Sequence, residues 1–339
     1  MKKELLTCGV LAAAAVSLAI AEVKINACGA SFPDAIYERW FADYNKAHPD
    51  VQINYTPSGS GAGVKSITER TVDFGASDMP MTDKELADAK RKIYHFPTVL
   101  GAVVPTYNIP GVTQELKFSG PVLAGIYMGT IKKWNDKALT SENPGVKLPG
   151  DDIIVVHRTD SSGTTFIFTD FLSKVSPEWK SKVGANKAVS WPTGLGSNQN
   201  AGVTELVKQT PGSIGYVELI YAIQNKIPYG WVKNASGAYI KASMESVSDA
   251  AAGVKMPDDF RVSITNAAGK NAYPISSFTW MLIPADIPNA NKAKAIHAFL
   301  GWMLTEGQKI APTLDFAPLP KPVVDKEQKQ LAMLEKGAH

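Results

Sequence analysis

Strand-like and helix-like segments alternate along the chain. Alternating or continuous apolar residues predict strands at 23–27, 51–55, 72–76, 98–107, 153–156, 213–217 and 273–283. Between the first two strands, Ile36, Trp40 and Tyr44 recur every four residues, which predicts a helix with one apolar face over 33–48. This succession is typical of an α/β sheet with largely parallel strands.

Other helices are predicted from start signals and spacing. Residues 82–85 (TDKE) form a capping box, because the Thr and Glu side chains can each bind a free amide at the helix start. Helical segments are also expected at 64–72, 163–175, 218–226, 289–304 and 325–336, whereas 234–271 is polar and rich in Ala, Ser and Asn. The sequence contains no repeat of solenoid length and no evident domain linker. The absence of a linker is expected if the domains are discontinuous and are joined by strands that cross from one to the other.

The first 21 residues predict a secretory signal peptide. Lys2 and Lys3 provide a short basic start, and an uncharged apolar run of about 16 residues follows at 5–20. That run is shorter than the roughly 20 residues that a membrane-spanning helix needs. Residues 19–21 (AIA) fit the small-x-small rule for cleavage. We therefore expect an exported, periplasmic chain without residues 1–21.

Cysteine usage leaves one alternative open at the N-terminus. Cleavage would remove Cys8 and leave Cys28 as the single thiol, so no disulfide framework is expected. Residues 25–28 (INAC) weakly resemble a lipobox, although Glu22 and Lys24 interrupt the preceding apolar run. A lipid-modified Cys28 is therefore the alternative to a free thiol.

Composition and charge exclude several classes of protein. Hydrophobic residues make up 45% and charged residues 20%, which excludes a disordered, collagen-like or coiled-coil chain. At roughly 150 residues per domain, 339 residues predict about two domains. The net charge of +3 comes without a basic block, so nucleic-acid binding is not expected. Five scattered histidines form no HExxH pattern, and neither a metal nor a cofactor is predicted.

Candidate chemistry gathers where hydroxyls and glycines meet expected helix starts. This trait is shared by four segments, 30–33 (ASFP), 58–63 (SGSGAG), 77–80 (SDMP) and 158–165 (RTDSSGTT). A helix N-terminus presents unpaired amides and a partial positive charge, and glycines let an anion approach them. Each segment alone is explained as well by an ordinary turn or N-cap. Together they indicate an oxyanion site.

Enzyme motifs fail on the same residues. Residues 59–66 (GSGAGVKS) are similar to a phosphate-binding P-loop, but Val64 stands where that motif and GxGxxG require glycine. No GxSxG nucleophile elbow occurs. His157 lies near Ser161 and Ser162 but is better explained as a strand-end residue. A secreted phosphoesterase, which would need a nucleophile–base pair or a metal cluster, is therefore the weaker hypothesis.

An ordered series of motifs is far more specific than any single segment. GASFPDAIYERW, YTPSGSGAGVKSI, VDFGASDMPMT, HFPTVLGAVVPTYNIPG, GPVLAGIYMGTIKKWND, VVHRTDSSGTTFIFTDFL, SWPTGLGSNQNAGV, GSIGYVE and YPISSFTWMLIP follow one another between about 25 and 320. The series closely resembles the periplasmic phosphate-binding proteins that supply ATP-driven phosphate importers. This resemblance implies a non-enzymatic, monomeric receptor whose partners are phosphate and a membrane permease.

The same resemblance implies an α/β periplasmic binding protein of type II, with two lobes that close like a Venus flytrap. One lobe would comprise 22–104 and 276–339, and the other 105–275. The chain would cross between them near 103–107 and again near 276. One phosphate would bind in the cleft between the lobes.

Site residues follow from the resemblance position by position. The first lobe would contribute Ser31, the Phe32 amide, Ser60 and Asp78, and the second Arg158, Ser162, Gly163 and Thr164. Asp160 would hold the Arg158 guanidinium, and 191–198 would shape the cleft rim. The chain departs from some relatives at Gly61, where they have a second Ser, and at His157, where Arg is common.

Asp78 is the expected source of selectivity. An ionised carboxylate only accepts hydrogen bonds, so it tolerates an anion that carries a proton, as phosphate does at neutral pH. Sulfate and molybdate lack that proton and would leave a buried acceptor beside a like charge. A binding protein for one of these oxyanions is the remaining alternative within the class.

Overall fold

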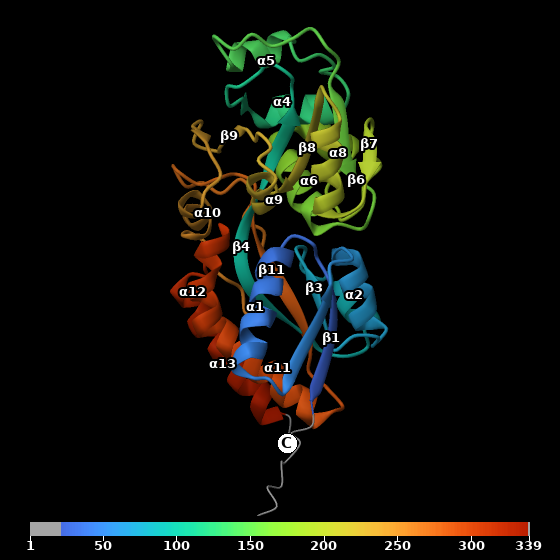
Figure 1. The fold of residues 1–339 in the computed structure, drawn as a ribbon, viewed down its shortest axis with the longest axis vertical. Helices are drawn as coiled ribbons and strands as arrows, with labels where there is room; N and C mark the ends of the chain where they lie inside the picture. Colours follow the sequence, from blue (N-terminus) through green and yellow to red (C-terminus); the bar gives the residue numbers. More distant parts are fainter. Residues whose placement is uncertain (1–21, 338–339) are drawn as a thin grey trace, which may run out of the picture.

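The structure is a computed structural model that describes residues 22–337, so the predicted leader at 1–21 and Cys8 lie outside the described residues. Its elements form two α/β lobes, one above the other along the long axis of the molecule (Figure 1). An eight-stranded sheet runs through both lobes in the order β2-β1-β3-β11-β4-β8-β6-β7. The predicted α/β fold with two lobes is therefore confirmed.

The lower lobe in Figure 1 contains both ends of the described chain. Its strands are β1 (Val23–Gly29), β2 (Val51–Thr56), β3 (Phe74–Ser77), β11 (Ser276–Pro284) and the first part of β4 (Ile93–Asn108). Its helices are α1 (Asp34–Ala47), α2 (Ser60–Thr68), α3 (Asp83–Asp88), α11 (Ala290–Trp302), α12 (Gln308–Ile310) and α13 (Lys321–Gly337). A π-helical turn, Met303–Gly307, extends α11, and a 3-10 turn, Ala311–Leu314, follows α12.

The upper lobe is built on β8 (Ser213–Glu218), β6 (Ile154–Arg158) and β7 (Leu195–Ser197). Its helices are α4 (Gly120–Tyr127), α5 (Lys137–Glu142), α6 (Gly163–Val175), α7 (Pro177–Lys182), α8 (Gln199–Gln209) and α9 (Leu219–Gln224). A small second sheet, β10 (Tyr239–Ile240), β9 (Trp231–Lys233) and β5 (Lys117–Phe118), lies beside β4 with α10 (Met244–Ala251) (Figure 1).

One strand belongs to both lobes. Residues 93–102 of β4 pair with β11, and residues 103–108 pair with β8. The flanking pairs β1–β2, β1–β3, β6–β7 and β6–β8 are parallel, but β11 is antiparallel to β3 and β4, and β4 is antiparallel to β8. The prediction of a largely parallel sheet is therefore wrong at the centre, because the strands there carry the chain from one lobe to the other and back.

Local sequence signals explain the elements around the cleft. The predicted apolar face of α1 is buried, and the capping box at Thr82 and Glu85 is formed. Helix α2 begins at Ser60, earlier than the predicted 64, because Gly59 adopts a φ of 97° and turns the chain into the helix. A Cβ on Gly63 would lie 2.3 Å from the Ala76 carbonyl oxygen, so glycine lets α2 approach the sheet closely.

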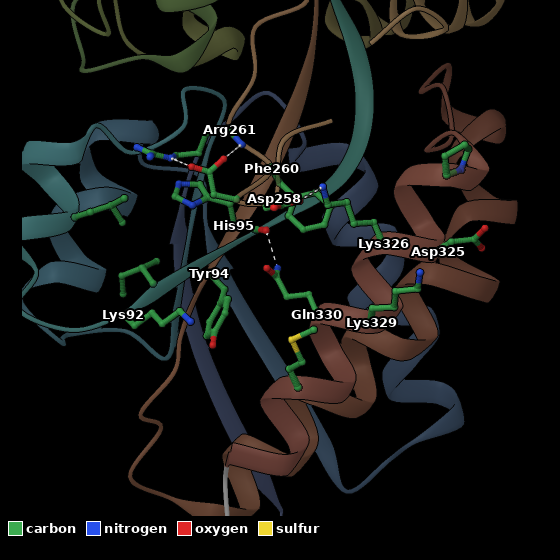
Figure 2. A pocket seen from close by; sticks show the side chains of 15 residues that line it. Lys92, Tyr94, His95, Asp258, Phe260, Arg261, Asp325, Lys326, Lys329 and Gln330 are labelled. Atoms are coloured by element: carbon green, nitrogen blue, oxygen red, sulfur yellow. Dashed lines mark hydrogen bonds and ion pairs between the residues drawn. The ribbon is translucent and has the colours of Figure 1, made fainter. Parts of the chain in front are cut away.

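Residues 256–261 of the segment after α10 lie against the lower lobe. Lys326 on α13 donates to the Met256 carbonyl at 2.9 Å and pairs with Asp258 at 2.7 Å, and Trp280 donates to the Phe260 carbonyl at 2.9 Å. A groove of about 890 Å³ follows this seam between β4 and α13 (Figure 2). Within residues 22–337, no helix combines the length and apolar composition needed to cross a membrane.

Candidate functional site

The eight residues predicted to bind the anion meet between the two lobes. Ser31, Phe32, Ser60 and Asp78 come from the lower lobe, and Arg158, Ser162, Gly163 and Thr164 come from the upper lobe. All eight are buried. The lobes are therefore closed over this position in the structure, and the open groove of Figure 2 is lined by other residues.

Two helix starts face each other across the interface. Ser162 caps α6, and its Oγ accepts the Thr165 amide at 3.0 Å. The amide of Gly61 in the first turn of α2 donates to the Ser161 carbonyl at 2.8 Å, which joins the lobes directly. A Cβ on Gly61 would lie 2.1 Å from Ser161 Oγ, so glycine at this position allows the close contact.

Arg158 is held rigidly by Asp160. Its Nε and Nη2 donate to the two carboxylate oxygens of Asp160 at 2.6 and 2.5 Å, while Nη1 lies 3.4 Å from Thr164 Oγ1. Burial disfavours the charged form of Asp160, but the hydrogen bonds and charge of Arg158 still lower its pKa. The guanidinium is thus fixed as a fork at the end of β6, beside the start of α6.

Asp78 lies immediately after β3 and faces the other lobe. Its Oδ1 accepts from Thr279 Oγ1 at 2.7 Å, and its Oδ2 lies 3.3 Å from Ser60 Oγ. Burial raises the pKa of Asp78 to about 7, although hydrogen bonds from Thr279 and Ser60 and the charge of Arg158 act in the opposite direction. Asp78 Oδ2 lies against Gly163, since a Cβ there would be 2.5 Å from it.

The hydroxyls of the site already accept hydrogen bonds from the protein. Ser31 Oγ accepts from the amide and the Nδ2 of Asn200 at 3.3 and 3.1 Å. Thr164 Oγ1 accepts from Arg158 and from Asn200 Nδ2, and Ser60 Oγ accepts the Asp78 amide at 3.0 Å. With these acceptor positions used, the hydroxyl protons of Ser31 and Thr164 are available to donate to an anion, whereas Ser60 donates its proton to Asp78 Oδ2.

Asn200 is a site residue that sequence analysis missed. It is fully buried at the start of α8, where its Nδ2 reaches Ser31 of one lobe and Thr164 of the other. Its Oδ1 accepts the Glu218 amide at 3.0 Å, which fixes the orientation of the side-chain amide. A lone Asn in the polar run SNQN gives no local signal of this bridging position.

The predicted rim segment 191–198 is split in the structure. Residues 192–196 are exposed, whereas Trp191 is half-buried and stacks on His157, with ring centroids 5.0 Å apart. Burial lowers the pKa of His157, whose Nδ1 lies 3.1 Å from the Arg158 carbonyl oxygen. His157 is thus part of an aromatic support beside β6, as a strand-end residue would be.

An ion pair also joins the lobes away from the site. Lys187 Nζ lies 2.5 Å from Glu85 Oε1, and the lysine side chain is almost fully buried. Burial opposes ionisation of Glu85, but its hydrogen bond with Lys187 and the amide of Thr82 lower its pKa. Since one partner is in α3 and the other follows α7, this pair contributes to the closed arrangement.

Two α/β lobes joined by crossing strands, and closed over a buried polar centre, define a solute-binding protein. A family model described as a PBP superfamily domain matches residues 14–306. The phosphate-binding protein PstS of Xylella fastidiosa (strain Temecula1) is 45% identical over 305 residues, covering 89% of this chain and 83% of the relative. PstS of Haemophilus influenzae is 42% identical over 304 residues, covering 89% and 90%.

Solved structures share the fold. A periplasmic phosphate-binding protein bound with phosphate (PfluDING) superposes with a TM-score of 0.73 at 20% identity, covering 91% of this chain and 93% of the other. A phosphate-binding protein from Stenotrophomonas maltophilia gives 0.70 at 20% identity, covering 91% and 94%. The chain therefore belongs to the PstS family of phosphate-binding proteins, within the PBP superfamily.

Proposed function

We propose that this chain binds inorganic phosphate in the periplasm and delivers it to the membrane permease of an ABC-type importer. The observation that carries the proposal is the convergence of donors from both lobes on one buried point, with Asp78 as the acceptor among them. Membership of the PstS family supports the same ligand and the same transport role. Residues 1–21 would direct export as a signal peptide and be cleaved from the exported chain.

The ligand contacts in this proposal come from buried residues of both lobes. Donors are the hydroxyls of Ser31, Ser162 and Thr164, the amides of Phe32 and Gly163, and the guanidinium of Arg158. The Ser60 hydroxyl, which donates to Asp78 Oδ2 in the structure, would turn to the ligand. Asp78 accepts a hydrogen bond from the protonated oxygen of the ligand, and Asp160 orients Arg158 without touching the anion. Because sulfate and molybdate lack that proton at neutral pH, a site built this way rejects them.

The division of the chain into lobes gives the mechanism of capture. We assign 22–104 with 276–339 to one lobe and 105–275 to the other, with β4 and the entry into β11 as the crossings. Because the donors are divided between the lobes, phosphate binds the closed form more tightly than the open form and shifts the equilibrium toward it. The permease would recognise the closed form of a monomer.

A receptor fits the site better than an enzyme. Ser162 Oγ already accepts the amide of Thr165 as the cap of α6, and the imidazole of His157 is stacked on Trp191. The neighbouring Ser161 is exposed and offers its carbonyl oxygen to Gly61. These serines thus serve helix capping and lobe closure.

Calorimetric titration of the chain from residue 22 tests the proposal. The protein is first stripped of bound ligand by unfolding and refolding, and phosphate and sulfate are then titrated in parallel at pH 7. We expect one-to-one binding of phosphate and no heat with sulfate. Equal binding of the two anions would favour a general oxyanion receptor, and binding of neither would contradict the proposal.

A Gly163→Ala variant is expected to bind phosphate roughly tenfold to a hundredfold more weakly, as overpacking of a tight contact predicts. The new Cβ would lie 2.4 Å from Ser60 Oγ and 2.6 Å from Asp78 Cβ, which belong to the opposite lobe. Closure would be hindered while each lobe keeps its packing. Calorimetry and thermal melting measure the two effects separately.

Gly253→Ala is the matched control for this variant, because a Cβ there meets nothing within 4 Å. We expect it to bind phosphate like the wild type. Wild-type affinity in Gly163→Ala would show that the lobes do not close to this contact when phosphate is bound.

A further inference from the structure

Thr279 on β11 lies directly behind the acceptor of the site. The antiparallel register pairs Trp280 with Ser77 of β3, and its continuation by one residue places Thr279 opposite Asp78. Thr279 is fully buried, and its Oγ1 donates to Asp78 Oδ1 at 2.7 Å. The two residues lie 201 positions apart in the sequence.

A β-bulge lies beside this threonine. The pairing of β11 with β4 shifts register between Thr279 and Trp280, because Thr98 is an extra residue of β4 between their partners Val99 and Pro97. All nine residues of β11 are buried, so the direction of the Thr279 hydroxyl is set by packing rather than by solvent.

A chain of hydroxyls fixes the backbone of Thr279 from the other side. Thr98 Oγ1 donates to the Thr279 carbonyl oxygen at 3.2 Å, which uses its single proton. Tyr37 therefore donates its own proton to Thr98 Oγ1, at 3.0 Å. Buried side chains of α1 and β4 thus hold the backbone of Thr279, and the Thr279 hydroxyl alone donates to the carboxyl group of Asp78.

We propose that Thr279 is a positioning residue for anion selectivity. Its hydrogen bond holds Asp78 Oδ1, so that only Oδ2 faces the ligand and accepts a hydrogen bond from it. The inference rests on the proposed phosphate-binding function. Oδ2 is the oxygen that lies against Gly163 and within 3.3 Å of Ser60 Oγ, at the proposed position of the anion. Thr279 touches no ligand group in this arrangement and acts through Asp78.

The hydroxyl also affects the charge of Asp78. The charged groups that act on this carboxyl are Arg158 and Asp160 of the upper lobe, with opposite effects, while the hydrogen bond from Thr279 lowers its pKa against the effect of burial. Without that bond, Asp78 would keep its proton to higher pH. A protonated Asp78 donates, and a site with a donor there no longer rejects sulfate.

A Thr279→Val variant tests this role because valine keeps the β-branched shape and removes the hydroxyl. Loss of a hydrogen bond to a charged group is expected to reduce the phosphate-to-sulfate affinity ratio roughly tenfold to a hundredfold at pH 7. Sulfate binding should also persist to higher pH than in the wild type. Thr279→Ser should restore both properties, and Thr279→Ala removes the same hydroxyl if the valine variant does not fold.

Ser277→Ala is the matched control on the same strand, because Ser277 is buried and its hydroxyl donates to the backbone carbonyl of Phe278. It should keep the wild-type ratio. An unchanged ratio and pH profile in Thr279→Val, or a similar change in Ser277→Ala, would overturn the inference while leaving phosphate binding by the wild type intact. A wild-type chain that does not bind phosphate would overturn the proposed function as well.

Discussion

Replacing Arg158 by alanine is expected to weaken phosphate binding roughly 10²- to 10³-fold. Arg158 is buried in the closed form, and its fork to Asp160 leaves Nη1 beside Thr164. Its removal takes a positive charge from the anion and leaves the carboxylate of Asp160 without its partner. Both changes act against a bound dianion, and calorimetric titration at pH 7 measures their sum.

Two further variants separate the loss of a ligand contact from a general effect of removing an arginine. Arg39→Ala removes an arginine paired with Asp43 on the exposed face of α1, and it should bind phosphate like the wild type. Arg158→Lys should recover part of the affinity, since it restores the charge but not the two parallel hydrogen bonds of the guanidinium. A loss below tenfold in Arg158→Ala would contradict a direct contact with the ligand.

The Asp78→Asn variant is expected to gain sulfate binding. A site that recognises a substrate hydroxyl rejects an analogue without it by about 10⁴- to 10⁵-fold, and we expect the variant to lose at least roughly a hundredfold of that preference. An amide can turn its NH₂ group toward an anion, whereas the carboxylate can only repel one that brings no proton. Parallel titrations with phosphate and sulfate give the ratio directly.

Asp88→Asn serves as the control, because Asp88 is exposed at the end of α3, where it pairs with Lys84. Its phosphate-to-sulfate affinity ratio should match that of the wild type. If Asp78→Asn kept the wild-type ratio, the donors alone would set the selectivity, and the role given to Asp78 would be wrong.

Local signals explain how much of the fold could be predicted. Helix α6 occupies the predicted 163–175 because Ser162 caps it, and α11 starts within a residue of the predicted 289 because Asn289 caps it. Helix α10 within 234–271 was not predicted, since its apolar face consists of little more than Val247 and two alanines. The order of strands in the sheet could not be predicted from local signals. Strand β11 is buried on both faces, so its residues do not reveal that it lies between β3 and β4.

The candidate site also contains residues that local signals reveal and residues that depend on long-range contacts. The hydroxyl- and glycine-rich segments could be recognised because each shapes the start of a helix or the end of a strand within a few residues. Asn200 and Thr279 could not, because each is a single polar residue whose partners lie far away in the sequence. Their positions depend on lobe closure and on strand register, which only the assembled fold defines.

The place of β11 also sets an order of events during synthesis. This strand lies between β3 and β4, so the sheet of the first lobe stays incomplete until residue 284 has been made. By then about five sixths of the 339 residues have been synthesised, and β3 and β4 have lacked the strand that lies between them. Contacts between such distant segments form slowly. For the exported receptor proposed here, we expect that delay to favour passage of the unfolded chain across the membrane.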